Sequence, residues 1–434
     1  MKIARRAGLG LAAGLLATAA FGQQQIATVP TAPKDLGIDP QRLERMTWAF
    51  QGWVDDGKLP GAVLLVSRYG EVVLFKSVGF RDREEKQPMT NEAIFRIASM
   101  TKPIVSVAAL ILAEEGKLDL VAPVAQYLPE FKDLKVRADR LDPATGRVED
   151  VLEAPRRPML VQDLLRHTAG LVYGPPIGRG PLAEAYREAN MGSRDETLGE
   201  MITKMSKLPL AHHPGEVWEY SMATDVLGRV IEVVSGLELD RFLAERVTGP
   251  LGMTSTGFSV GPDKAGLIAQ HQIDPATGKR PPQWDPLVKP RRLSGGGGLV
   301  SSAADYLRFA AMLMQGGAGP NGRLLSPATV QLMTSNALSP GVAVVPSRAV
   351  DISPTPAMGQ GFGLGFAVRT ENGQNPLPGT AGSYYWTGAF GTTFYVDPRQ
   401  QLVSIMMIQS PSPENSFYRR AFRYLTYQAL TRVD

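Results

Sequence analysis

Two serines in this sequence stand in patterns that can support nucleophilic catalysis. Ser259 lies in GFSVG, which fits the G-x-S-x-G pattern of a nucleophile elbow, and Ser99 begins the tetrapeptide SMTK. An elbow requires a strand before the serine, a helix directly after it and a histidine further along the chain. Pro262 and the glycines around it do not start an amphipathic helix, and His271 is the only histidine downstream. We therefore interpret GFSVG as a surface loop.

The SMTK segment has a more favourable context. It is the only S-x-x-K sequence in the chain, and the apolar segment that follows predicts a helix ending at Gly116. Pro103 is tolerated if the helix begins near Ser99, because the first N–H groups of a helix have no intrahelical partner. The Ser99 hydroxyl then lies at a positive helix end, with Lys102 on the same face. Burial of Lys102 would favour a neutral amine that could accept the serine proton.

Two later segments could complete such a site. Ser221 can cap the amphipathic helix of YSMATDVLGRVIEVVSG, which puts the phenol of Tyr220, a possible general base or acid, at the mouth of that helix. The other segment, YYWTGAFG, reads as a strand carrying Trp386-Thr387-Gly388. A strand glycine permits close approach of another backbone. The N–H groups of Ala389 and Ser99 could therefore form an oxyanion hole.

Composition limits the other chemistries. The 434 residues include no cysteine, so the chain has no disulfide, no thiol nucleophile and no thiolate metal site. The formal net charge is +4, and without three basic residues at the extreme N-terminus 43 basic side chains face 42 acidic ones. This balance favours neither a nucleic acid nor an anionic membrane as a partner. The four histidines lack H-E-x-x-H spacing, so we expect no metal and no cofactor. They are His167, His212, His213 and His271.

The N-terminus has the layout of a secretory signal peptide over residues 1–22. Basic residues precede an apolar run from Ala7 to Phe21, and Ala20-Phe21-Gly22 resembles a cleavage site. The alternative is a membrane anchor, but a span needs roughly 20 apolar residues and this run is shorter. We expect export to a bacterial periplasm with no stable membrane anchor.

The expected elements predict an α+β fold. Residues 40–56 predict a helix capped by Asp39, and the segment from Gly61 to Gly79 predicts two strands around a turn at Tyr69-Gly70. Helices dominate the middle, four short strands follow Gly361, and a helix closes the chain. Strands at both chain ends with helices between them indicate a sheet built from both termini and an inserted helical lobe.

Three ordered motifs are similar to those of the serine β-lactamase and penicillin-binding protein superfamily. Ser99-Met100-Thr101-Lys102 matches S-x-x-K, Tyr220-Ser221-Met222 matches Y-x-N in its tyrosine, and Trp386-Thr387-Gly388 aligns with K-T-G. The resemblance covers the chain from about Leu36 and is strongest to the class C β-lactamase-like branch. It implies an antiparallel sheet flanked by helices, with an α/β lobe at about 36–98 and 300–434 and a helical lobe at about 99–299.

The departures from these motifs favour esters over lactams. Trp386 stands where penicillin-recognising relatives use a lysine to hold a carboxylate, and it offers only an apolar face and one N–H. Met222 removes an amide that could contact a lactam side chain. Tryptophan at this position resembles the family VIII carboxylesterases. The resemblance therefore implies a small neutral ester as substrate, contacted by Trp386, Thr387, Gly388 and Met222, with weak β-lactam hydrolysis possible.

The predicted function is serine carboxylesterase. Ser99 is the nucleophile, Lys102 and Tyr220 form the proton-transfer unit, and the sequence does not decide which of those two acts first. The alternatives are a class C-type β-lactamase, a D-amino-acid peptidase or amidase, and a non-catalytic binding module of the same fold. Natural substrate and oligomeric state are not readable from the sequence.

Overall fold

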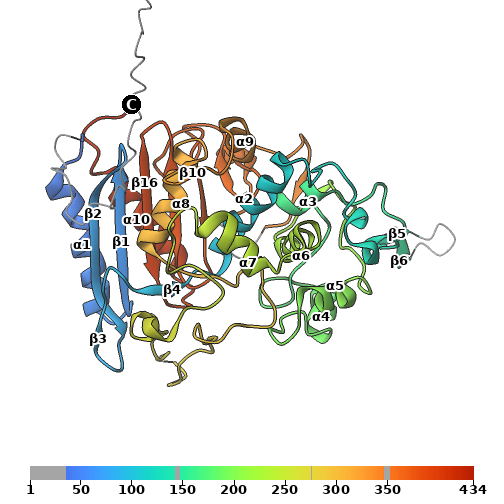
Figure 1. Ribbon diagram of the computed structural model, residues 1–434, viewed down its shortest axis with the longest axis horizontal. Coiled ribbons are helices and arrows are strands. Elements are labelled where there is room, and N and C mark those ends of the chain that lie inside the picture. Colours follow the sequence, from blue (N-terminus) through green and yellow to red (C-terminus); the bar gives the residue numbers. More distant parts are fainter. Residues whose placement is uncertain (1–35, 142–146, 275, 347–351) are drawn as a thin grey trace, which may run out of the picture.

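A large antiparallel sheet forms one side of the molecule (Figure 1). The computed structural model describes residues 36–141, 147–274, 276–346 and 352–434. The sheet has eight strands in the order β12-β13-β14-β15-β16-β1-β2-β3. The strands are β1 (Gly61–Arg68), β2 (Glu71–Asp82), β3 (Gln87–Pro88), β12 (Gln360–Phe362), β13 (Ala367–Arg369), β14 (Tyr384–Thr387), β15 (Thr393–Asp397) and β16 (Leu402–Ile408).

Strands from the two chain ends meet at the β1–β16 pair. Ala62 faces Ile408 and Arg68 faces Leu402 in antiparallel register, which joins the N-terminal hairpin to the C-terminal strands. Every residue of β1 is buried. A strand with apolar side chains on both faces must be packed against other elements on both faces, because exposing apolar surface to water is unfavourable. The predicted fold class, a sheet built from both ends with an inserted helical part, is confirmed.

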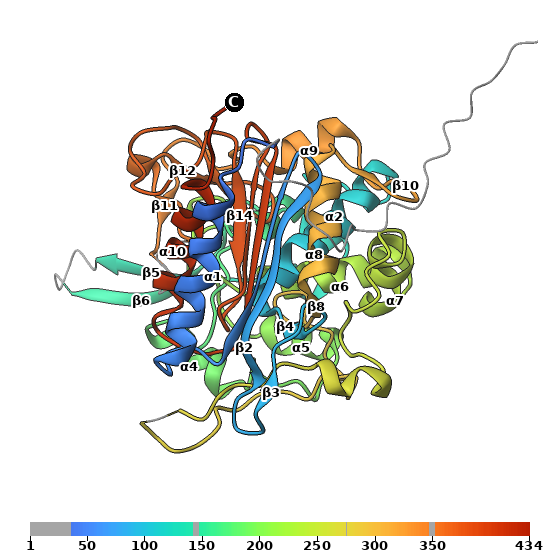
Figure 2. The same cartoon turned by 90° about the vertical axis from the view of Figure 1, so that its left-hand side faces the viewer.

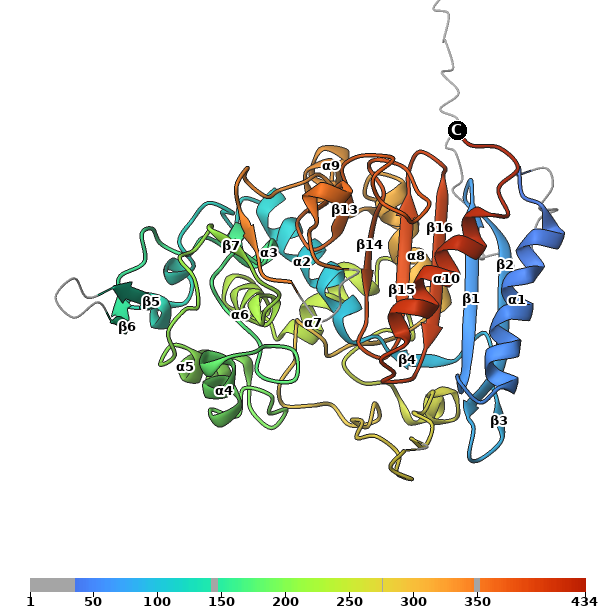
Figure 3. The ribbon, with the colours of Figure 1, turned by 180° about the vertical axis from the view of Figure 1, so that it is seen from behind.

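Helices provide that cover. α1 (Pro40–Asp55) and α10 (Asn415–Tyr427) lie against one face, and α8 (Ala303–Met314) packs on the other, next to α2 (Thr101–Glu114) (Figure 2). The capping prediction for α1 is confirmed, because the Asp39 carboxylate accepts from Gln41 N. At the start of α8, Ser302 Oγ accepts from Asp305 N. Figure 3 shows α1 and α10 side by side across the sheet.

The middle of the chain carries helices and short strand pairs. Its helices are α3 (Val161–Leu165), α4 (Pro181–Glu188), α5 (Leu198–Met205), α6 (Ala223–Ser235), α7 (Leu239–Leu243) and α9 (Pro327–Met333). Its strands are β4 (Ile94–Arg96), β5 (Val136–Leu141), β6 (Val148–Glu153), β7 (Val217–Trp218), β8 (Val300–Ser302), β9 (Ala318–Gly319), β10 (Gly322–Arg323) and β11 (Ala343–Val344). The β5–β6 hairpin projects from the end of the molecule farthest from the sheet (Figure 1).

One local prediction is wrong. Ser221 does not cap α6: the residue before the helix is Met222, and it makes no side-chain capping bond. The Ser221 hydroxyl instead lies 3.3 Å from His167 Nδ1. A buried hydroxyl needs a hydrogen-bond partner, and here the packing provides His167 as that partner.

Two other predictions are not tested by the structure. The signal peptide at 1–22 lies outside the described residues, and the exact lobe boundaries stay a prediction. Within the described ranges, no helix is both long and apolar enough to span a bilayer.

Candidate active site

A strained turn presents Ser99 at the start of α2. Ala98 has a φ of 44°, in the left-handed region that a side chain disfavours, and residues 98–100 form a single 3₁₀ turn before α2 begins at Thr101. Buried contacts hold the turn in place: the Tyr306 hydroxyl donates to the Met100 carbonyl at 2.9 Å. Non-glycine residues in this region persist only where the surroundings impose them, and they are frequent at functional sites.

Lys102 is buried next to this turn. Its side chain is on α2 with 1% of the residue exposed, and its Nζ donates to the Gly296 carbonyl at 2.7 Å and to the Tyr173 hydroxyl at 3.0 Å. The same nitrogen lies 4.6 Å from the ring centre of Tyr220. No carboxylate of the described chain forms an ion pair with Lys102, so its surroundings are dipoles and aromatic faces rather than a counter-charge.

Tyr220 completes a contact chain to the serine. Its hydroxyl lies 2.7 Å from Ser99 Oγ, and its ring packs against those of His167 (5.0 Å), Tyr173 (5.3 Å) and Trp386 (5.7 Å). The structure therefore brings Tyr220, which is 121 positions from Ser99 in sequence, into one cluster with Ser99 and Lys102.

His167 holds Tyr220 without adding charge. His167 is 2% exposed. This burial, together with the neighbouring Lys102, lowers the pKa of the His167 imidazole well below its usual value. The Ser221 N–H donates to its Nδ1 at 3.4 Å, so a neutral ring with its proton on Nε2 fits the site.

The end of β14 lies against the Ser99 turn. A Cβ on Gly388 would lie 2.3 Å from the Ile97 carbonyl oxygen, so only glycine fits this approach. Ala389 follows and is exposed to solvent, with no hydrogen bond to its N–H among the described groups. This placement brings the Ala389 segment beside the Ser99 turn, as the oxyanion-hole prediction requires.

The predicted substrate-binding residues are all buried. Trp386 is fully buried, packs edge-on against Phe362 at 5.4 Å, and its indole N–H has no partner in the described part of the chain. Thr387 and Met222 are each 4% exposed. In this conformation Trp386 supports the Tyr220 ring from behind, and its direct contact with a substrate stays a prediction.

Tyr173 and Gly296 were missed by the sequence analysis. Burial first, and then Tyr220 and Asp225, raise the pKa of Tyr173 far above its usual value, so it stays a neutral phenol that accepts the Lys102 hydrogen bond. Gly296 belongs to the run GGGG, where a Cβ would meet Asp225 Oδ2 at 2.3 Å. Four consecutive glycines were the available signal for such a close backbone approach, whereas Tyr173 carried none.

Ser259 makes no hydrogen bond to Ser99, Lys102 or Tyr220 in the described part of the chain. It follows Gly257, which bridges Val300 in backbone hydrogen bonds, and precedes a 3₁₀ turn, Pro262–Leu267, rather than an α-helix. None of the described histidines hydrogen-bonds to it. The strand–serine–helix context of an elbow is absent from this segment.

Of the remaining histidines, two are paired with glutamates and the third is buried. His212 pairs with Glu219 at 2.7 Å and His213 with Glu153 at 3.0 Å, while His271 Nε2 lies 2.9 Å from Gln409 Nε2. The described residues contain no group of three or more metal-ligating side chains.

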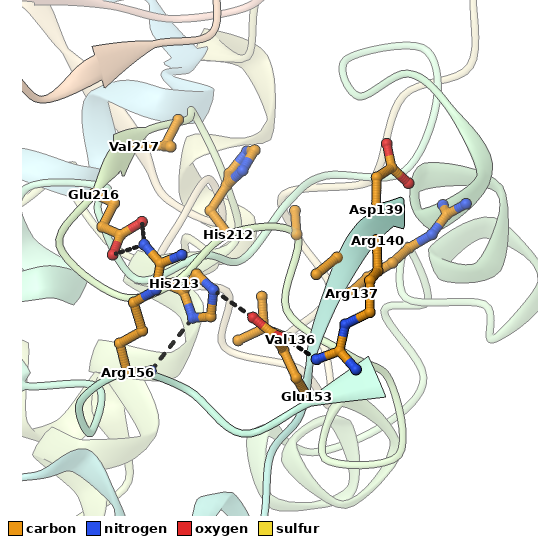
Figure 4. Close-up of a pocket in the computed structure, with 12 residues that line it drawn as sticks. Val136, Arg137, Asp139, Arg140, Glu153, Arg156, His212, His213, Glu216 and Val217 are labelled. Atoms are coloured by element: carbon orange, nitrogen blue, oxygen red, sulfur yellow. Dashed lines mark hydrogen bonds and ion pairs between the residues drawn. The ribbon is translucent and has the colours of Figure 1, made fainter. Parts of the chain in front are cut away.

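A cavity of about 490 Å³ lies at the base of the β5–β6 hairpin (Figure 4). Arg156 and Glu216 pair across one side of it at 2.8 Å, and the His213–Glu153 pair lies beside them. Its charged groups therefore largely neutralise one another.

The fold and the Ser99 cluster define a serine hydrolase built on the β-lactamase fold. Consistent with this, the Beta-lactamase family profile matches residues 43–428, and the chain belongs to that family. An uncharacterized protein of Mycobacterium tuberculosis is 37% identical over 361 residues, 82% of this chain and 87% of that protein.

Two further relatives carry descriptive names. Esterase EstB of Burkholderia gladioli is 30% identical over 393 residues, 88% of this chain and 94% of the relative. The solved structure of EstCE1, described as a hydrolase with promiscuous acyltransferase activity, superposes with a TM-score of 0.73 at 28% identity, covering 89% of this chain and 99% of that one. The predicted superfamily, with esterases among its members, is confirmed.

Proposed function

We propose that the protein is a carboxylesterase that works through an acyl-serine intermediate. One observation carries the proposal: the Tyr220 hydroxyl lies 2.7 Å from Ser99 Oγ while the Lys102 ammonium lies over the Tyr220 ring at 4.6 Å. A nucleophile, a proton acceptor and a cation that stabilises the acceptor are thus in contact. The names of the relatives Esterase EstB and Lovastatin esterase support ester substrates.

The first half of the reaction forms the acyl-enzyme. Ser99 Oγ attacks the ester carbonyl carbon, and its proton passes to the Tyr220–Lys102 unit. The carbonyl oxygen, now an anion, accepts from the N–H groups of Ser99 and Ala389. As the C–O bond breaks, Tyr220 returns the proton to the leaving alcohol.

The second half releases the acid. Water attacks the carbonyl carbon of the Ser99 ester, with Tyr220 taking its proton. As the C–Oγ bond breaks, Tyr220 returns that proton to Ser99 Oγ, which regenerates the free serine and releases the carboxylic acid. Tyr173 stays protonated because of its raised pKa, so its oxygen holds Lys102 in place rather than exchanging a proton.

Esters are favoured over β-lactams by the tryptophan on β14. Trp386 stands at the position where a K-T-G lysine would present a cation, and it lies fully buried among aromatic rings. We propose that β-lactam hydrolysis is at most weak.

The test compares two chromogenic substrates with three proteins. Hydrolysis of p-nitrophenyl butyrate and of a chromogenic cephalosporin is measured for the wild type, Ser99→Ala and Ser259→Ala. Ester turnover lost only in Ser99→Ala, with cephalosporin turnover far lower, supports the proposal. Loss in Ser259→Ala alone, in a folded protein, contradicts it.

A further inference from the structure

An unusual group of basic and aromatic side chains lies beside the Ser99 cluster. The Arg194 guanidinium lies over the Trp284 indole, 4.4 Å from its ring centre, and Arg96 lies over the same ring at 5.9 Å. Trp284 in turn packs against Phe390 at 5.7 Å. Because Phe390 directly follows Ala389, this wall adjoins the proposed oxyanion hole.

A second link ties the group to Tyr173, the phenol that holds Lys102 in place. The Arg292 N–H donates to the Arg194 carbonyl at 3.1 Å, and Arg292 is close enough to Tyr173 to oppose the rise in the pKa of that phenol. Asp225, which lies against Gly296, also acts on both Tyr173 and Arg194. The group therefore acts on Tyr173, the phenol that accepts the Lys102 hydrogen bond.

Three donors of this group have no partner in the described part of the protein. Arg194 Nη2, Arg292 Nε and Trp284 Nε1 are all buried atoms that lack a hydrogen-bond partner in the described chain. The Arg194 side chain has no hydrogen bond or ion pair at all within that part of the structure. Buried N–H donors nearly always have partners, and three unpaired donors on residues that contact one another point to an acceptor that is not part of the protein.

The charges of the group are only partly compensated. Arg96 is 2% exposed and donates to two neutral carbonyls, those of Trp284 (2.7 Å) and Ala269 (2.8 Å), rather than to a carboxylate. Arg292 pairs with Glu196 at 3.3 Å, and that carboxylate is shared with Lys204 at 2.6 Å.

Nearby aspartates partly compensate the positive charge of the group, but none of them forms an ion pair with Arg194 in the described part of the chain. Burial first, and then Arg292, lower the pKa of Arg194, while Asp225 and Asp195 favour its charged form and offset part of that shift. The Asp225 carboxylate is engaged by the Ser294 hydroxyl at 2.5 Å. Asp285 acts on Arg96 in the same favourable sense.

We infer that Arg194, Arg292 and Trp284 form a subsite for a carboxylate carried by the ester substrate. The inference rests on the proposed esterase function and names its substrate class: esters whose acyl or alcohol part bears a carboxylate. A guanidinium with an adjacent indole N–H can donate two or more hydrogen bonds to one carboxylate, and such charge-assisted bonds are strong. Phe390 and Trp284 provide the apolar wall along which the linker reaches the ester.

The experiment compares kcat/KM within two substrate pairs. The acyl pair is p-nitrophenyl hydrogen glutarate and p-nitrophenyl hexanoate, and the alcohol pair is 4-acetoxybenzoate and 4-acetoxybenzamide. We expect the wild type to prefer the anionic member of one pair by about tenfold or more, which also shows on which side of the ester the carboxylate lies.

Variants then test the named donors. Arg194→Gln is expected to lower the anionic-to-neutral ratio about tenfold, and Trp284→Phe, which keeps a ring but removes the N–H, about threefold. Arg291→Gln is the matched control, because Arg291 is exposed and paired with Glu200 at 3.2 Å, and it should leave the ratio unchanged. If Arg194→Gln does not fold, an inhibition assay on the wild type replaces it. We then expect glutarate to inhibit ester turnover and glutaramide not to inhibit it.

The possible failures are distinguishable. Hydrolysis of neutral esters with no preference for the anionic member in either pair, or a preference that Arg194→Gln leaves intact, overturns the subsite and leaves the esterase proposal standing. Equal inhibition by glutarate and glutaramide also overturns it. Absence of hydrolysis for all four esters removes the esterase proposal and the subsite together.

Discussion

Replacing Tyr220 by phenylalanine isolates the contribution of one hydroxyl. The substitution removes the oxygen 2.7 Å from Ser99 Oγ but keeps the ring that packs on His167 and Trp386. If this oxygen is the proton carrier, the expected loss is that of a general acid–base group, about 100- to 10,000-fold in kcat. That range corresponds to a barrier increase of about 3–5.5 kcal/mol.

The effect on folding should be much smaller. The variant loses one partly buried hydrogen bond, worth about 1 kcal/mol, which in a protein of this size lowers Tm by about 1–2 °C. Turnover of p-nitrophenyl butyrate and thermal unfolding are measured on the same preparations. Tyr384→Phe is the matched control, since the buried Tyr384 hydroxyl has no partner in the described chain. A Tyr220→Phe kcat within tenfold of wild type, or a loss equalled by Tyr384→Phe, would refute the reasoning.

Three further predictions concern the surroundings of the site. Gly388→Ala places a Cβ 2.3 Å from the Ile97 carbonyl, so we expect about 1–3 kcal/mol of destabilisation and at least tenfold lower kcat/KM, measured by denaturant unfolding and ester turnover. Trp386→Lys puts an unpaired cation where the tryptophan is fully buried, and it should cost at least about 3 kcal/mol and create no efficient cephalosporinase. Burial first, and then Arg96, lower the pKa of His271 to about 4, so the wild type should lose stability as pH falls from 6.5 towards 4, and His271→Gln should lose less.

The sign and size of the His271 effect follow from proton uptake. Between pH 6.5 and about 4 the unfolded chain binds a proton that the folded protein does not, so this contribution to stability is complete above pH 6.5 and declines below it. The difference in pKa corresponds to about 3 kcal/mol, and we expect roughly half of that after local relaxation. Parallel pH profiles for wild type and His271→Gln would contradict the assignment.

Each of the other two predictions has its own contrary outcome. A Gly388→Ala protein with normal turnover would mean that β14 does not need to touch the Ser99 turn. A Trp386→Lys protein of unchanged stability that hydrolyses cephalosporins efficiently would mean that the buried tryptophan is not what limits lactam hydrolysis.

The sequence predicted those parts of the site that depend on local spacing or on an ordered motif. Ser99 and Lys102 lie one helical turn apart, so their proximity follows from helix geometry alone. Tyr220 and Trp386 were identified by motif order, and the glycine after Thr387 indicated a close backbone approach.

The missed contacts depend on which distant segments the fold brings together. Tyr173 reaches Lys102 across 71 positions of sequence, and Arg194 meets Trp284 from a separate loop, so no local period marks either pair. Ser221 was assigned to a helix cap on local preference, but tertiary packing offered its hydroxyl to His167 instead. Buried polar partners of this kind are set by the packed structure rather than by neighbouring residues.

The central claim, that Ser99 carries the acyl group, is most directly tested by mass spectrometry of the enzyme quenched with acid during turnover of p-nitrophenyl butyrate. The account predicts a mass increase of one butyryl group, found in the peptide that contains Ser99 and absent from Ser99→Ala. A butyryl group located on Ser259, or turnover that continues in Ser99→Ala at the wild-type rate, would contradict it.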